Sequence, residues 1–177
     1  KGSGNDSDVR KTGTINIGGN AKVFAFSKYD GAGIGGGSEG NMNGTINIRG
    51  NAKVIAASGR KGAGIGAGAI TEDENRNAQG GNMSGTITID GNATVNASAG
   101  NKYGAGIGTG RVRTWRSPWM NLDDGGDMSG TITIGGNAKV TAKSEGSAAG
   151  MGTGGEGEMS GTINIGDNAS VNADSTG

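Results

Sequence analysis

The segment Gly85-Thr86-Ile87-Thr88-Ile89 decides the fold of this chain, because close copies of it occur five times. A second segment with the pattern Asn-Ala-x-Val follows each copy after two residues. A third segment, Gly-Ala-Gly-Ile-Gly or a variant of it, follows in the first four copies. The copies are 31, 41, 45 and 31 residues apart, counted between Thr14, Thr45, Thr86, Thr131 and Thr162. An internal repeat of this length is typical of a solenoid, in which each copy buries one face against its neighbours.

Within each segment apolar and polar residues alternate, which is the pattern of a strand with one buried face. In the first copy we expect Ile15 and Ile17 to point inward, and Thr14 and Asn16 to point outward. The second segment should likewise turn its Ala and Val residues inward. In the third segment we expect the alanine and isoleucine inward and the bare glycines outward.

Copies of one strand must then lie side by side in parallel, about 4.8 Å apart. We therefore predict an all-β fold, a right-handed parallel β-helix (solenoid) of about five coils with three short strands each; the hand follows the general preference of parallel crossovers. A methionine should close each coil. A corner asparagine in each coil should adopt the left-handed conformation and hydrogen-bond along the stack. The interior columns should be Ile15/Ile46/Ile87/Ile132/Ile163, Val23/Val54/Val95/Val140/Val171 and Ile34/Ile65/Ile107/Met151.

Composition narrows the class of function. The chain has 177 residues, 41 of them Gly, and only 3% aromatic residues, so its core must consist of backbone and small side chains. Sixteen basic residues balance sixteen acidic ones, which argues against a nucleic-acid partner. No apolar run is long enough to insert into a membrane. The chain has no His and no Cys, which removes the commonest general base and metal ligands; we expect no enzyme, no cofactor and no metal site.

The domain organisation follows from the repeat. Residues 1–11 are polar and are predicted to be disordered or the remnant of a preceding coil, and 12–177 form the β-helix domain. Two copies carry insertions after the third segment, at 69–81 and 111–127. Both insertions leave the stack at the same corner of neighbouring coils, so they should touch. Insertions in solenoids often mark the binding face.

The longer insertion contains both tryptophans of the chain. Trp115 and Trp119 offer flat aromatic faces, and Arg113 and Arg116 offer hydrogen-bond donors, a combination that suits a sugar ring. The alternative is that the tryptophans pin the insertion to the stack, because a long loop must bury something to stay ordered.

Three other surface features allow a function. The acids Asp123, Asp124 and Asp127 could join residues 72–74 around a hard cation, although solvated surface charge is the favoured interpretation. The outward Thr and Asn residues of the first strands form a flat grid that resembles an ice-binding face, although Thr is also common in exposed strands. Bare glycine on the third segment implies the close approach of another body, of which the insertions are the simplest; a second chain or a ligand is the alternative.

Large apolar residues are expected on the outside only near the start of the stack. Phe24, Phe26 and Ile55 occupy outward positions where later copies have polar residues. Such a patch either covers preceding residues or contacts a protein.

The repeat Gly-Thr-Ile-Thr-Ile-Asp-Gly-Asn-Ala-Thr-Val-Asn-Ala at 85–97, with Gly-Ala-Gly-Ile-Gly at 104–108, resembles the Gly-rich β-helix repeats of secreted and cell-wall proteins of Gram-positive, often gut-dwelling, bacteria. It is similar to the carbohydrate-binding β-helix family related to pectate-lyase-like folds. The resemblance implies a bacterial protein, extracellular or at the cell surface, with a glycan ligand.

The leading hypothesis is a non-enzymatic binding or adhesion module that holds a glycan through its inserted loops. The alternatives are recognition of a host protein, as an adhesin or by binding an immunoglobulin-type ligand, a structural stalk, and ice binding.

Overall fold

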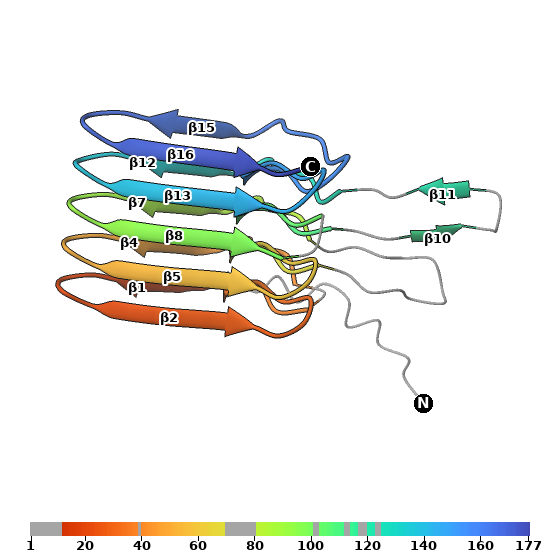
Figure 1. Cartoon of the computed structure of the whole chain (residues 1–177), viewed down its shortest axis with the longest axis horizontal. Helices are drawn as coiled ribbons and strands as arrows, with labels where there is room; N and C mark the ends of the chain where they lie inside the picture. The colour runs from red at the N-terminus through yellow and green to blue at the C-terminus, as the bar shows by residue number, and fades with distance from the viewer. Residues whose placement is uncertain are drawn as a thin grey trace.

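The computed structural model is a parallel β-helix, and it describes residues 12–38, 40–69, 81–100, 103–111, 114–116, 120–122 and 125–177. The described residues form strands and no helix. Figure 1 shows the strands stacked as rungs, with one sheet in front of another. Residues 1–11, predicted to be disordered or a coil remnant, lie outside the described residues.

Three parallel sheets run along the stack, and each takes one strand from successive coils. Sheet A contains β1 (Thr14–Ile17), β4 (Thr45–Ile48), β7 (Thr86–Ile89), β12 (Thr131–Ile134) and β15 (Thr162–Ile165). Sheet B contains β2 (Lys22–Ser27), β5 (Lys53–Ser58), β8 (Thr94–Ala99), β13 (Lys139–Ser144) and β16 (Ser170–Ser175). Sheet C contains β3 (Ile34–Gly35), β6 (Ile65–Gly66), β9 (Ile107–Gly108) and β14 (Met151–Gly152).

The register confirms the predicted interior columns. In every sheet the inward residues pair with their counterparts in the next coil, as when Ile46 pairs with Ile87, Val54 with Val95 and Ile65 with Ile107. In the middle coils these side chains are fully or almost fully buried, and burial of one such side chain stabilises the fold by about 1.5–3 kcal/mol. The closing methionines also stack, in the order Met42, Met83, Met128, Met159.

The asparagine ladder at the corner between sheets A and B is present along the whole stack. The side-chain amide of Asn51 donates to Asn20 Oδ1 at 3.1 Å, and Asn92, Asn137 and Asn168 continue the series. The predicted left-handed conformation of these asparagines is wrong. The positive φ lies on the residue before each of them, which is Gly in four coils and Asp167 (φ 53°) in the fifth. Glycine adopts that conformation without a Cβ clash, and the asparagine is left to form the ladder.

Another body does approach the glycines of the third segment closely, as predicted, but the predicted identity of that body is wrong. Gly64 and Gly106 are buried. A Cβ on Gly33 would lie 2.6 Å from the backbone nitrogen of Ala57 and 2.8 Å from the carbonyl oxygen of Gly64. The body that approaches these glycines is therefore the backbone of the next coil, and not an insertion, a second chain or a ligand.

The bases of the two insertions touch, whereas 70–80 lie outside the described residues, so contact between the projecting parts stays a prediction. Gly110 N donates to the carbonyl of Gly81, where the first insertion returns to the stack, at 3.2 Å, and Gly126 N donates to the carbonyl of Gly110 at 3.0 Å. The second insertion contains an antiparallel hairpin that the repeat did not predict, made of β10 (Thr114–Arg116) and β11 (Met120–Leu122). Figure 1 shows this hairpin projecting beyond the ends of the main strands.

Replacing Gly108 by Ala should destabilise the stack by more than about 2 kcal/mol. Gly108 has φ +137°, and a Cβ there would collide with the carbonyl of Gly152 in the next coil. Gly37→Ala is the matched control, because Gly37 has ordinary φ and open space around its Cβ position. Urea unfolding of both variants measures the difference; equal stabilities would show that the coils do not approach as closely as described.

Replacing Asn92 by Ala should cost about 1–3 kcal/mol, because the change removes two ladder hydrogen bonds at about 0.5–1.5 kcal/mol each. Asn20→Ala, at the end of the ladder, removes one of these bonds and should cost about half as much. Chemical denaturation of both variants checks the ratio. If Asn20→Ala costs as much as Asn92→Ala, the asparagines act as separate corner residues and not as a ladder.

Candidate binding surface

The outer face of sheet B is a grid of three columns, because the first, third and fifth residue of each strand point outward and the strands are in register. The sheet lies nearest the viewer in Figure 1. From the first coil to the last, the columns are Lys22/Lys53/Thr94/Lys139/Ser170, Phe24/Ile55/Asn96/Thr141/Asn172 and Phe26/Ala57/Ser98/Lys143/Asp174.

An aromatic cluster lies at the start of this face, with its three rings in the first coil and Ile55 in the second. Phe24 is 79% exposed, Phe26 70%, Tyr29 58% and Ile55 45%. This confirms that Phe24, Phe26 and Ile55 point outward. Tyr29 was not predicted, because it lies in the corner after β2, where strand alternation no longer applies. Contiguous exposed side chains of this size mark contact surfaces in folded proteins.

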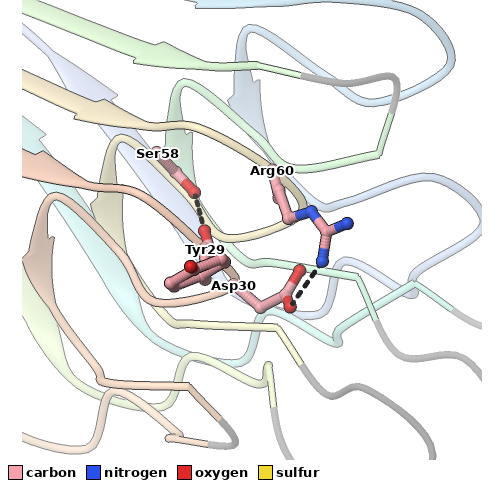
Figure 2. A network of polar contacts seen from close by, with 4 residues as sticks. All are labelled: Tyr29, Asp30, Ser58 and Arg60. Carbon is pink, nitrogen blue, oxygen red and sulfur yellow. Dashed lines mark hydrogen bonds and ion pairs between the residues drawn. The ribbon is translucent and has the colours of Figure 1, made fainter.

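The corner that carries Tyr29 is tied to the next coil (Figure 2). Ser58 Oγ donates to the carbonyl oxygen of Tyr29 at 3.3 Å. Asp30 is only 4% exposed, and its Oδ2 lies 4.0 Å from Arg60 Nη1. Lys28 Nζ lies 5.3 Å from the centre of the Tyr29 ring. The corner that follows β2 is therefore anchored to the next coil, and it places one ammonium group near the Tyr29 ring.

A shallow depression continues from the aromatic cluster toward later coils. Its volume is about 250 Å³, and it is lined by Ile55, Asn96, Ala97, Ser98, Thr141 and Lys143. It lies where the outward residues of the middle coils are short, between the large side chains of the first coils and Lys143. Its lining offers one apolar wall, an amide, two hydroxyls and an ammonium group.

The predicted glycan site in the longer insertion is only partly described. Trp115 and Arg116 lie on β10, where they pair with Asn121 and Met120, and only their backbone is described. Arg113 and Trp119 lie outside the described residues. This site stays a prediction.

The base of the hairpin is well anchored. Arg111 is 5% exposed and bridges to Gly125 across the base. Its guanidinium lies 3.5 Å from the centre of the Tyr103 ring, at cation–π distance. Its backbone nitrogen donates to the carbonyl of Lys61 at 3.0 Å. Arg111 therefore belongs to the stack and not to the projecting part of the insertion.

The acidic residues considered for a cation have one described member. Asp127 Oδ1 accepts a hydrogen bond from the backbone nitrogen of Glu158 at 3.0 Å. One coil earlier, Asn82 Oδ1 accepts in the same way from the backbone nitrogen of Asp127. Two coils earlier, Asn41 Oδ1 accepts from the backbone nitrogen of Asn82. Asp127 thus continues a structural ladder. Asp123, Asp124 and 72–74 lie outside the described residues, and among the residues that the structure describes no group of three or more acidic, His or Cys residues comes together.

The outer face of sheet A carries the predicted grid of Thr and Asn. Thr14, Thr45, Thr86, Thr131 and Thr162 form one column in register. The second column begins with Asn16, whose Oδ1 accepts from the side-chain amide of Asn47 at 2.9 Å. The predicted grid is therefore present, whereas ice binding by it stays a prediction.

No described helix is long and apolar enough to cross a membrane.

Replacing residues 112–124 with a short Gly-Ser link should leave the stack folded with nearly the same melting temperature. Arg111 and Gly125, which anchor the hairpin, are kept in this variant. As a comparison, Arg111→Ala in the full chain should lower the melting temperature, because it removes the contact with Tyr103. Circular dichroism melts of both variants test this. Unfolding of the link variant would mean that the hairpin supports the stack.

No protein-family model, no curated protein and no solved structure matches this chain, so the chemistry of its own surfaces is what points to a function.

Proposed function

We propose that the chain is a non-enzymatic binding module that holds a glycan on the outer face of sheet B. The observation that carries the proposal is the continuity between the aromatic cluster of the first two coils and the polar depression beside it. We further propose, from the resemblance of the repeat, that the module belongs to a secreted or cell-surface bacterial protein.

The two parts of this face match the two kinds of surface on a sugar. A pyranose ring has an apolar C–H face, which packs on aromatic rings such as those of Phe24 and Phe26. Its edge carries hydroxyl groups, which can pair with the amide of Asn96 and the hydroxyls of Ser98 and Thr141. An apolar surface beside a few placed polar groups is a combination typical of ligand recognition.

The shape of the depression favours a chain over an enclosed small molecule. Its volume of about 250 Å³ lies below the range of about 300–1,000 Å³ that is usual for pockets around drug-sized ligands. An oligosaccharide lying across several coils would use the depression for one residue and the aromatic cluster for another.

The scaffold supports binding because the side chains stand on strands held in register. Their backbone is fixed by ladder hydrogen bonds on both sides in the middle coils. A preorganised face loses less conformational entropy on binding than a flexible loop does. The lining of the depression has no carboxylate, so it offers no acid pair for glycoside hydrolysis.

A protein partner is the second candidate, favoured by the high exposure of Phe24 and Phe26 on one face. Large aromatic residues of this kind supply much of the binding energy in protein interfaces.

The double substitution Phe24→Ser and Phe26→Ser should weaken glycan binding at least tenfold, with little change in melting temperature, because both rings are largely exposed in the free chain. Trp115→Ala serves as the matched aromatic control and should stay within about twofold of the unchanged chain. A glycan array identifies the ligand, and titration calorimetry measures the affinities.

Two outcomes would contradict the proposal. Loss of glycan binding in Trp115→Ala, with binding kept in the double variant, would place the site in the hairpin. Binding of a secreted protein but no glycan, sensitive to the double substitution, would support the second candidate instead.

A further inference from the structure

Charge is distributed unevenly over the two main faces. The outer face of sheet B carries four lysines, Lys22, Lys53, Lys139 and Lys143, against one acid, Asp174. The outer face of sheet A carries Thr and Asn and no charged residue. The whole chain has a formal net charge of zero, so the positive charge of sheet B is a local feature of the surface that also holds the aromatic cluster.

Three of these lysines form one column. Lys22 pairs directly with Lys53 on the adjacent strand, and Lys139 lies two coils beyond Lys53, about 10 Å further along the stack. Like charges opposite each other on neighbouring strands destabilise a sheet. All four lysines are exposed, and none makes an ion pair or a side-chain hydrogen bond with another described residue. The repulsion between Lys22 and Lys53 is therefore not offset within the described part of the chain.

The lysine column runs beside the column that contains the aromatic and polar contacts. Outward neighbours along one strand, such as Lys53 and Ile55, are about 7 Å apart. A polymer lying along the stack could therefore place its rings over Phe24, Ile55, Asn96 and Thr141 and its charged groups over the lysines. Lys143 adds an ammonium group to the lining of the depression.

We infer that the ligand of this face is an acidic polysaccharide, whose carboxylate or sulfate groups lie along the Lys22–Lys53–Lys139 column while its sugar rings lie on the neighbouring column. This inference rests on the proposed function and names the class of glycan. The lysines contact the anionic groups as point charges. Lys22 and Lys53 are about 5 Å apart, within the Debye length of about 8 Å at physiological salt, and Lys139 is about 10 Å from Lys53, so neighbouring charges of the column are only partly screened from each other.

A nucleic acid is the less favoured polyanion. Its binding requires a broad basic field, whereas this chain is neutral overall. Single strands also need aromatic rings at successive positions for base stacking, and the exposed rings of this face are confined to the first coil.

The test uses the full chain and a matched pair of probes, dextran sulfate and unmodified dextran. Hyaluronate is added as a carboxylate probe. A single-stranded DNA oligonucleotide represents the competing class of polyanion. Affinities are measured by titration calorimetry at low and at physiological salt. We expect dextran sulfate or hyaluronate to bind, dextran to bind at least tenfold more weakly, and affinity for the acidic glycan to fall as salt is raised.

The lysine column is tested by substitution. Lys22→Gln/Lys53→Gln/Lys139→Gln should weaken binding of the acidic probe at least tenfold, and Lys53→Gln alone about threefold. Arg49→Gln is the control for Lys53→Gln, because Arg49 lies four residues before Lys53, is exposed, and its replacement removes the same single charge, but its side chain donates to Asn47 of sheet A. It should leave the affinity within about twofold.

The outcomes separate this inference from the proposed function. If a neutral glycan binds and neither salt nor the lysine substitutions change its affinity, the inference is wrong and the proposed function stands. If no glycan of either kind binds, both are wrong. If the DNA oligonucleotide binds as tightly as the acidic glycans and depends on the same lysines, the face is a general polyanion site and the assignment to polysaccharide is overturned.

Discussion

The close approach of consecutive coils is the constraint on which the rest of the structure depends. Parallel strands in register must lie about 4.8 Å apart, and the third segment brings backbone against backbone with no room for a side chain. Gly35, Gly66, Gly108 and Gly152 occupy this position in successive coils, all with positive φ. At Gly35, Gly66 and Gly108 glycine is needed for two reasons, its freedom of φ and its lack of a Cβ atom, whereas at Gly152 only the first reason applies. The high glycine content is thus a condition of order in this chain.

Once the coils stack in this way, inward and outward positions have separate roles. The interior must repeat, because each Ile, Val or Met packs on its counterpart in the next coil. Outward residues are free to differ, and sheets A and B differ greatly. Sheet A keeps uncharged Thr and Asn along its length, whereas sheet B changes from Phe24 to Thr141 along one column and carries the lysines. The variable face is where recognition chemistry can be placed without cost to the stack.

Much of this structure could be predicted from the sequence, because equivalent positions of successive repeats are the ones that pair between coils. Alternation located the buried Ile and Val columns, the exposed Phe24 and Phe26, and the Asn20-to-Asn168 ladder. Alternation could not reveal the close contact between Gly33 and Ala57, because that contact depends on how the third segment of one coil packs against the sheet B strand of the next coil. Tyr29 was not predicted because it lies in a corner, where the residues do not alternate. The lysine column was not predicted because Lys22, Lys53 and Lys139 form a column only once the register of the strands is known. The hairpin lies outside the repeat, although the Ser117-Pro118 pair between its strands is a turn signal in the sequence.

The most direct test of the whole account is to map the backbone amides that shift in nuclear magnetic resonance spectra when dextran sulfate is added to the isotope-labelled chain. The account predicts shifts at outward positions of β2, β5, β8 and β13, centred on Ile55, Asn96 and Thr141, and unchanged signals along sheet A and on β10 and β11. Shifts confined to Trp115 and its neighbours, or to the Thr and Asn grid of sheet A, would contradict it.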